Sequence, residues 1–242
     1  MSPIIHHFPP ALAHGPLREV FTDIFLVTGA MHGLIGGAPW QFSRNMTVVR
    51  EGDQLTLINA LRLDDAGLAQ LERLGRVAHV VKLGALHGRD DAFNVAHHGA
   101  TFWALPGMTH DEGLLPDKLL VPGGEMPFAG CELFAFATTR QPEGILRVDR
   151  DGGVLIACDA LQHWPAPDEF FADDTRRIMQ EMGFFHGANL GPVWMQINEP
   201  QAEDFARLEQ LEFRHVLAGH GAPLREHARD AFAATFRRVF GA

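Results

Sequence analysis

The chain has 242 residues, of which 46% are hydrophobic and 21% charged, which excludes a disordered or fibrous protein. Its 20 Lys and Arg residues against 30 Asp and Glu residues give a formal net charge of −10, so nucleic acid and an anionic membrane surface are not expected partners. No run of about 18 apolar residues occurs, so we expect no segment that spans a bilayer. The length fits one large domain.

The cysteine and serine content narrows the compartment and the chemistry. Cys131 and Cys158 are too few for a disulfide framework, and the N-terminus lacks the basic region of a signal peptide, so we expect a cytoplasmic protein. The only serines, Ser2 and Ser43, lie outside any Gly-x-Ser-x-Gly motif, which argues against a serine hydrolase. Fourteen histidines are then the main supply of functional groups, which favours metal binding or acid–base chemistry.

The first half of the chain is rich in predicted strands. Glu51-Gly52-Asp53 separates two of them and indicates a hairpin. Asp64 can cap a helix whose apolar residues recur every three to four positions. We predict strands over 17–28, 45–50, 54–59, 77–83 and 101–105, and helices over 64–74 and 90–98.

The second half repeats this alternation of strands and helices. A tight turn at Asp151-Gly152-Gly153 joins two of the strands. We predict strands over 118–121, 131–138, 144–148, 154–158 and 214–218, and helices over 168–182, 201–208 and 224–240. Two successive strand-rich halves predict two sheets packed face to face with helices outside. We expect one domain over residues 1–242, with residues 1–16 as an extended N-terminal segment.

Four loops follow predicted strands and carry polar side chains. They are His87–Asp91, Thr138–Gly144, Cys158–Leu161 and Ala218–Gly221. Such loops commonly supply ligands because the sheet holds their ends rigidly. Asp159 and His220 each follow a buried strand, where a polar group needs a partner.

The same four segments, in this order, resemble the metallo-β-lactamase superfamily. The likeness runs from about Phe21 to the C-terminus and is strongest in Gly-Val-Leu-Ile-Ala-Cys-Asp-Ala-Leu, residues 153–161, and His-Val-Leu-Ala-Gly-His-Gly, residues 215–221. The motif Asn-Met-Thr-Val-Val-Arg, residues 45–50, resembles a motif carried by one bacterial branch of that superfamily. The fold of this branch is better known than its reaction. The resemblance implies an α/β protein (α+β) with a four-layer αββα sandwich.

The resemblance implies only part of the family's metal site. His87 and Asp91 match two positions of the His-x-His-x-Asp-His motif, while Arg89 and Ala92 occupy the other two. The histidine of the middle loop falls at or near Arg140. Asp159 matches the bridging aspartate and His220 the final histidine. The motif is therefore degenerate, and the implied metal ligands are His87, Asp91, Asp159 and His220.

The two arginines change the expected chemistry of this site. A guanidinium group is always charged and repels a cation in the same space. Arg89 and Arg140 could instead balance Asp91 and Asp159 without any metal. We therefore keep two alternatives open, one divalent ion (zinc, iron or manganese) or none.

Three functions follow from these alternatives. The leading one is a metal-dependent hydrolase-like protein with a mononuclear site, in which Asp91 and Asp159 are the catalytic carboxylates and an ester, lactone, thioester or phosphoester is the substrate. The second is a metal-free regulatory or binding protein for a small anion held by Arg89 and Arg140. The third is a non-catalytic homo-oligomer with a vestigial pocket. In all three a small molecule is the expected ligand class, and an exposed Phe184–Phe185 pair in the loop 183–192 favours a homodimer.

Overall fold

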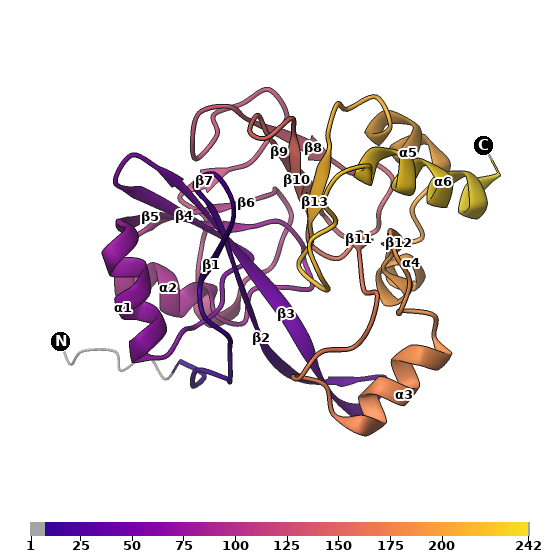
Figure 1. Cartoon of the computed structure of the whole chain (residues 1–242). Helices are drawn as coiled ribbons and strands as arrows, with labels where there is room; N and C mark the ends of the chain where they lie inside the picture. The colour runs from indigo at the N-terminus through magenta and orange to yellow at the C-terminus, as the bar shows by residue number, and fades with distance from the viewer. Residues whose placement is uncertain (1–7, 242) are drawn as a thin grey trace.

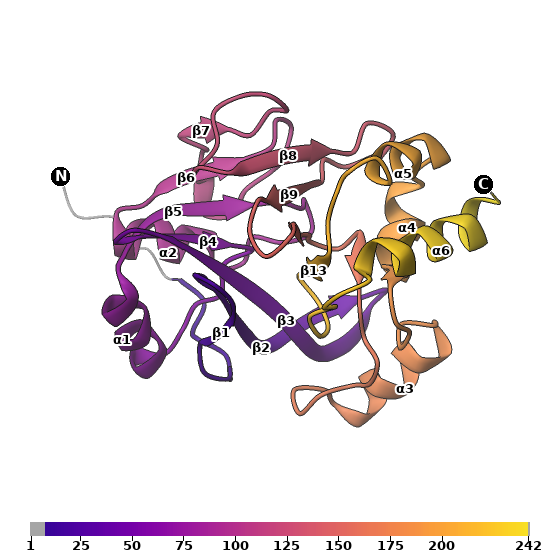
Figure 2. The same cartoon turned by 45° about the horizontal axis from the view of Figure 1, so that its top comes forward.

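The computed structural model describes residues 8–241. Two β-sheets lie face to face at its centre, and helices cover their outer faces (Figures 1 and 2). The larger sheet has the order β1 (Arg18–Phe21), β2 (Ile24–Ile35), β3 (Ala38–Glu51), β4 (Gln54–Ile58), β5 (Arg76–Lys82), β6 (Thr101–Ala104), β7 (Lys118–Leu119). Strands β1 to β4 pair antiparallel, and β4 to β7 pair parallel.

The smaller sheet has the order β13 (His215–Leu217), β10 (Val154–Ile156), β9 (Gly144–Val148), β8 (Cys131–Ala135). Its strands β10 and β13 are parallel neighbours, so their carboxyl ends lie at the same edge. A short pair, β11 (Leu161–Gln162) with β12 (Asn189–Leu190), lies beside it.

The helices complete the outer layers. Helices α1 (Asp65–Leu74) and α2 (Asp91–His98) pack against β5, while α6 (Ala228–Phe240) packs on β13 and on α5 (Ala202–Leu208). Helix α4 (Pro192–Asn198) lies on the same side as α5 and α6 (Figure 1). Helix α3 (Asp173–Glu181) packs instead on the end of β3, and a short 3₁₀ turn spans Asp111–Gly113.

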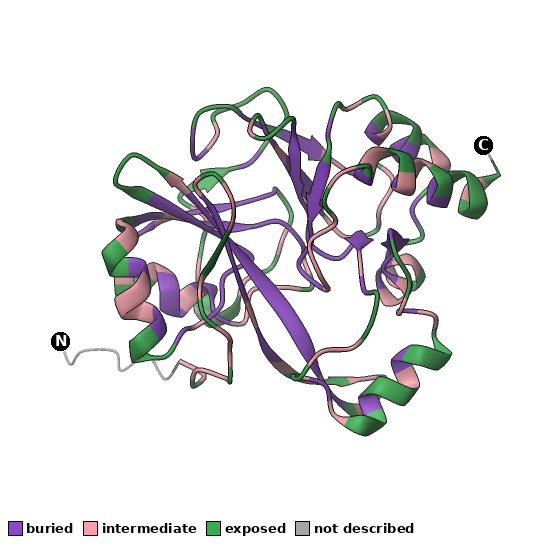
Figure 3. Cartoon of the chain, viewed as in Figure 1, coloured by how far each residue is buried: buried purple, intermediate pink, exposed green. Residues whose placement is uncertain are grey.

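Side-chain alternation along the strands explains why the layers stack. In β5, Val80 packs with the helices, whereas Val81 packs with Leu146 and Ile156 of the smaller sheet. In β10, Leu155 faces α5 and α6. Central strands such as β10 are buried on both faces, which explains their continuous apolar sequence. Figure 3 shows the central strands buried and the outer faces of the helices exposed, whereas the edge strands β1 and β7 are largely accessible. The predicted αββα arrangement is therefore confirmed.

Several element boundaries differ from the prediction. Strands β2 and β3 form one long hairpin, because Gly36 and Gly37 adopt positive φ angles of 59° and 82° and make the two-residue turn that we did not predict. Helix α3 begins at Asp173 rather than at 168, since Asp168 accepts a hydrogen bond from the Ser43 hydroxyl.

Two further differences lie near the C-terminus. Helix α6 begins at Ala228 rather than at 224, because Leu224 pairs with Val216 of β13. Helix α4 was not predicted at all; it begins at Pro192, a residue that suits the first turn of a helix.

The predicted N-terminal segment is described only in part. Residues 1–7 lie outside the described residues, and residues 8–13 have no regular secondary structure. His14 makes an isolated bridge with Gly29. Within the described part of the chain, no helix combines the length and apolarity needed to cross a bilayer.

Candidate active site

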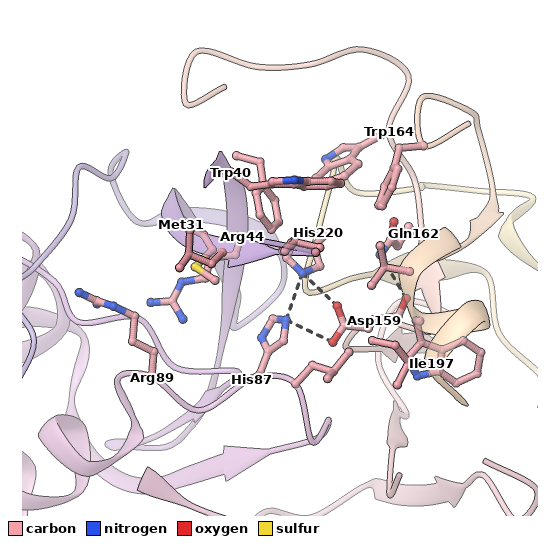
Figure 4. A pocket seen from close by; sticks show the side chains of 18 of the residues that line it. Met31, Trp40, Arg44, His87, Arg89, Asp159, Gln162, Trp164, Ile197 and His220 are labelled. Carbon is pink, nitrogen blue, oxygen red and sulfur yellow. Dashed lines mark hydrogen bonds and ion pairs between the residues drawn. The ribbon is translucent and has the colours of Figure 1, made fainter. Parts of the chain in front are cut away.

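Three loops meet where the two sheets face each other (Figure 4). One follows β5 and carries His87. The other two follow β10 and β13, where Ile156 pairs with Leu217, so Asp159 and His220 each come three residues after a paired position. The parallel pairing therefore brings Asp159 and His220 to one edge, and the facing sheet adds His87.

The three side chains form a cluster, which we call the His–Asp–His cluster (His87, Asp159, His220). The Nε2 atom of His220 lies 3.1 Å from Nε2 of His87 and 3.1 Å from Oδ1 of Asp159. The Nε2 atom of His87 lies 3.5 Å from Oδ2 of Asp159. All three side chains are at most 10% exposed.

Hydrogen bonding fixes the tautomer of His220. Its Nδ1 atom lies 2.9 Å from the main-chain carbonyl oxygen of Ser43. A carbonyl oxygen only accepts, so Nδ1–H is the donor, and a neutral His220 presents its lone pair at Nε2. This is the arrangement of a metal-binding histidine, whose second nitrogen is held by an outer partner.

Burial and neighbouring charges set the ionisation of the cluster. Burial lowers the pKa of His87, although Asp159 opposes this, so the ring is held neutral. Burial alone would raise the pKa of Asp159, but His87 and His220 hold it well below its usual range. A divalent metal binds a carboxylate and neutral imidazole, so the directions for Asp159 and His87 suit a metal site.

The donor atoms also have the spacing of a metal site. Ligands about 2.05 Å from a tetrahedral zinc ion lie about 3.3 Å from one another. The three contacts in the cluster are 3.1, 3.1 and 3.5 Å. The two imidazole nitrogens and the carboxylate oxygens can lie this close only with a proton or a cation between them. The residues present therefore fit one divalent ion with three protein ligands.

Two asparagines of the larger sheet hold the Asp159 and His220 loops in place. Asn45 of β3 donates from Nδ2 to the carbonyl oxygens of Ala218 (3.0 Å) and Gly221 (2.7 Å), on either side of His220. Asn59, after β4, donates to the carbonyl oxygen of Ala157. These asparagines fasten the His220 and Asp159 loops to the larger sheet.

Glu143 holds the Asp159 loop through hydrogen bonds to its main chain. Its Oε1 atom accepts from the main-chain N–H groups of Asp159 (2.9 Å) and Ala160 (2.6 Å). Burial and the Asp159 carboxylate raise the pKa of Glu143 well above its usual range, while the two N–H groups oppose this. Glu143 is 2% exposed, so it acts through the backbone and not on a ligand.

Sequence reasoning missed Asn45, Asn59 and Glu143 as site residues. One signal was available, because Ser43, Arg44 and Asn45 interrupt the apolar pattern of a long strand and are all buried. Buried polar groups in a strand need partners across the fold. Glu143 lies in the predicted polar loop Thr138–Gly144, but its hydrogen bonds to the Asp159 backbone could not be predicted from the sequence.

Cys158 lies against the cluster, and its thiol belongs with His87 and Asp159 to a group of side chains that could hold a metal ion. Its Sγ atom, the Asp159 carboxylate and a ring nitrogen of His87 lie within 4.8 Å of one another. The thiol donates to Oδ2 of Asp159 over 3.6 Å. Burial raises the pKa of Cys158 well above its usual range, which favours the protonated thiol while no metal is bound.

Asp91, the fourth predicted ligand, lies apart from the cluster. It is the first residue of α2, is 3% exposed, and its Oδ2 atom has no hydrogen-bond partner among the described residues. A Cβ atom added to Gly88 would lie 2.7 Å from Nζ of Lys82 and 3.2 Å from Oδ2 of Asp91. The Lys82 ammonium group therefore supplies the positive charge beside Asp91.

The two predicted anion-binding arginines lie in different places. Arg89 lines the cavity above the cluster and bonds Asp90. Arg140 lines a separate cavity and pairs on the surface with Glu199, with 62% of its side chain exposed. A second arginine does line the cluster's cavity, but it is Arg44.

A cavity of about 430 Å³ opens above the cluster (Figure 4). Its walls are mostly apolar and come from the β2–β3 hairpin, the loop after β11 and helix α4. Trp40, Trp164, Val193 and Ile197 are among the lining residues. Such an apolar cavity with a few convergent polar groups is typical of a small-molecule site.

The Phe184–Phe185 pair was predicted to be exposed, and this is wrong. Phe184 is 5% exposed, lines the cavity and packs against Trp40 and Trp164. Phe185 is half-buried against Trp164 and Phe171. Phe184 therefore forms part of the site, and the pair is not the exposed aromatic surface from which we expected a homodimer.

Comparison with known proteins identifies the fold. No family model and no curated protein matches the chain. Solved structures do match, including the metallo-β-lactamase FIM-1 from Pseudomonas aeruginosa in a mono-zinc form, with 14% identity, a TM-score of 0.59, and 96% of this chain and 98% of that chain covered. A metallo-β-lactamase from Erythrobacter litoralis shares 16% identity at a TM-score of 0.59, covering 92% of this chain and 96% of the other. One from Hirschia baltica shares 14% at 0.56, covering 92% and 98%. The protein therefore has the metallo-β-lactamase fold.

Proposed function

We propose that this protein is a metal-dependent hydrolase-like protein in which His87, Asp159 and His220 hold a single divalent ion. The observation that carries the proposal is the triangle of donor atoms, 3.1, 3.1 and 3.5 Å apart, with the lone pair of His220 directed into it. The fold supports it, since a solved structure of similar shape is described as a mono-zinc metallo-β-lactamase.

The surrounding charges favour one ion over two. Lys82 lies beside Asp91, and Arg89 and Arg44 line the cavity next to His87. A second divalent ion among these groups would meet like charges in a partly buried region, where repulsion is strong. The proposed ligand set therefore does not include Asp91. The predicted role of Asp91 as a catalytic carboxylate is not part of the proposal either.

A divalent ion in this cluster would lower the pKa of a bound water and polarise a substrate carbonyl or phosphoryl group. The chain itself contributes the rest. The Ser43 carbonyl orients the His220 ring, Glu143 holds the Asp159 backbone, and Trp40, Trp164 and Phe184 keep bulk water away. Imidazole and carboxylate donors admit zinc, iron or manganese, and an ester, lactone, thioester or phosphoester is the proposed substrate.

Hydrolysis before and after metal removal tests this function. A panel of one ester, one lactone, one thioester and one phosphoester is assayed on the protein as purified, after chelation, and after return of zinc, iron or manganese. We expect chelation and His220→Gln to abolish the same activity. His32→Gln, which changes an exposed histidine of β2, is the matched control and should keep it. Activity that survives both chelation and His220→Gln would refute the proposal.

The metal-free anion-binding alternative remains a second candidate, because two arginines line the cavity. Its predicted pair, Arg89 and Arg140, is separated in the structure, but Arg44 lies beside Arg89. A protein of this kind would bind a small anion with equal affinity before and after chelation.

A further inference from the structure

One end of the cavity carries more positive than negative charge. Arg44 and Arg89 both bond the carboxylate of Asp90, Arg44 from Nη2 to Oδ2 and Arg89 from Nη1 to Oδ1. Asp90 is 1% exposed and lines no part of this cavity, whereas both arginines do. Two guanidinium groups share the Asp90 carboxylate, so this end of the cavity has one positive charge that Asp90 does not balance; the other carboxylate of the cavity, Asp159, lies in the His–Asp–His cluster.

Arg44 also has an unused donor. It is 4% exposed, and its Nε atom is buried without a hydrogen-bond partner among the described residues. A buried donor of a charged group that lacks a partner is costly, and a bound anion removes this cost. Arg89 is less buried, with 24% of its side chain exposed, so the charge is reachable from the cavity.

The other end of the cavity is apolar and has one unpaired acceptor. Trp164, Ile197 and Gln162 lie on the far side of the cluster from Arg44 and Arg89 (Figure 4). Gln162 is 3% exposed and donates from Nε2 to the carbonyl oxygen of Asp159 over 3.2 Å. Its Oε1 atom is buried and unpartnered in the described structure.

From this arrangement we infer that the cavity binds an amphipathic monocarboxylate. The carboxylate lies on Arg44 and Arg89, an aliphatic or aromatic group fills the space beside Trp164 and Ile197, and an N–H or O–H donor of the ligand reaches Gln162. The positive charge that Asp90 leaves unbalanced suits a monoanion, and guanidinium N–H groups form charge-assisted hydrogen bonds with a carboxylate. The inference rests on the proposed function in one respect only: the His–Asp–His cluster lies between the two ends, so the bond to be cleaved lies between the carboxylate and the apolar group.

Three matched probes test the inference by calorimetric titration. N-benzoylglycine carries a carboxylate, an N–H donor and a phenyl ring. Its primary amide lacks only the charge, and O-benzoylglycolate lacks only the N–H group. N-benzoylglycine and its amide are titrated into the protein both as purified and after chelation, because a carboxylate could otherwise bind a metal directly. O-benzoylglycolate is an ester and is compared only in the chelated protein, where the proposed hydrolysis cannot occur. We expect N-benzoylglycine to bind at least tenfold more tightly than the amide in both preparations, and more tightly than O-benzoylglycolate.

Substitutions test which residues cause the tighter binding of the acid than of the amide. Arg89→Gln leaves Arg44 to neutralise Asp90 and should abolish the preference for the acid over the amide, while Arg89→Lys should retain part of it. Arg238→Gln removes the same charge from the exposed face of α6 and should have no effect. Arg140→Gln should also have no effect, because Arg140, which the sequence analysis assigned to the anion site, lines a different cavity.

The outcomes separate this inference from the proposed function. Equal binding of acid and amide, no binding of any probe, or a preference that survives Arg89→Gln overturns the inference. Equal binding of N-benzoylglycine and O-benzoylglycolate overturns the assignment of Gln162. An acid preference in a protein that holds no metal would uphold the inference while the proposed function fails.

Discussion

At the scale of single residues, the site depends on buried polar groups that have few alternative hydrogen-bond partners. Asn45 shows this most clearly, because its side-chain N–H₂ group holds the carbonyl oxygens on both sides of His220 and its Oδ1 atom accepts from the Thr28 hydroxyl over 2.8 Å. The side-chain amide of Asn45, in the larger sheet, thus fixes the position of His220, a proposed ligand from the smaller sheet.

The first prediction concerns this amide. Asn45→Ala leaves two carbonyl oxygens without their donor and should reduce the free energy of unfolding by about 2–3 kcal/mol. Thr28→Val removes only one hydrogen bond and should cost about 1 kcal/mol. Urea unfolding of the two variants checks the order, and a loss in Asn45→Ala no larger than that in Thr28→Val would contradict this account of the loop.

The second prediction concerns the protonation of Asp91. Burial raises the pKa of Asp91 from 3.8 to about 6, against the opposing effect of Lys82. Between these pH values the folded protein binds a proton that the unfolded chain has released, so the free energy of unfolding should fall by roughly 3 kcal/mol as the pH rises from about 4 to about 6.

Asp91→Asn should remove this slope and make the protein more stable than the parent at pH 8, with little change at pH 4. Asp65→Asn, an exposed change in the first turn of α1, is the control and should leave the slope in place. Urea unfolding at several pH values measures it. A variant less stable than the parent at pH 8 would mean that Asp91 has a cationic partner strong enough to offset its burial.

At the scale of elements, loops are fixed by the helices and strands on which they lie. Asp204 of α5 is fully buried and accepts hydrogen bonds from the main-chain N–H groups of Ala137 and Thr138 and from the Thr138 hydroxyl. It also pairs with Arg207. This carboxylate attaches the chain after β8 to the outer helical layer.

The third prediction follows from these contacts. Asp204→Ala should reduce the free energy of unfolding by about 3 kcal/mol, because two main-chain N–H groups, the Thr138 hydroxyl and Arg207 lose a common acceptor. Glu203→Ala, at the exposed neighbouring position, should change it by less than about 0.5 kcal/mol. Burial alone would raise the pKa of Asp204, but its hydrogen bonds lower it, so this stabilisation should be lost as the pH falls below 4. Equal effects of the two variants at pH 7 would contradict this role.

The elements also show which part of the architecture a sequence can predict. Apolar alternation and turn residues predicted most strands, because these signals are local. The start of α6 was predicted four residues too early, because the pairing of Leu224 with Val216 is a contact that helical periodicity does not contain. The extension of β2 and β3 depended on the turn at Gly36 and Gly37, which we did not interpret as a hairpin.

The candidate site, like the fold, was predictable where local sequence signals determine it and not where long-range contacts do. Asp159 and His220 follow buried strands that proved to be parallel neighbours, so their convergence follows from topology. Arg140 could not be placed, since its loop has no register to align. Arg44 was missed because its role depends on Asp90, which lies 46 residues away on a different element.

At the scale of the whole molecule, the cluster joins the two halves of the chain. His87 comes from the larger sheet, whereas Asp159 and His220 come from the smaller one, and the apolar cluster containing Val81 and Ile156 lies between the sheets. An ion bound by all three ligands would therefore stabilise the packing of one sheet on the other.

The fourth prediction uses this link between binding and folding. A metal present at a thousandfold excess over its Kd stabilises the folded protein by about 4 kcal/mol, which is about 10 °C in Tm for a chain of this size. Chelation should lower Tm by that order, and return of the metal should restore it. The His220→Ala variant should show no shift, and an equal shift in that variant would place the metal elsewhere.

The most direct test of the central claim is the metal content of untagged protein purified without chelators, measured by elemental mass spectrometry. The proposed site predicts about one divalent ion per chain, a value near zero in His87→Ala, Asp159→Ala and His220→Ala, and no loss in Asp91→Asn. A parent protein that holds no metal even after zinc, iron or manganese is added would contradict the claim, as would a content near one that persists in all three alanine variants.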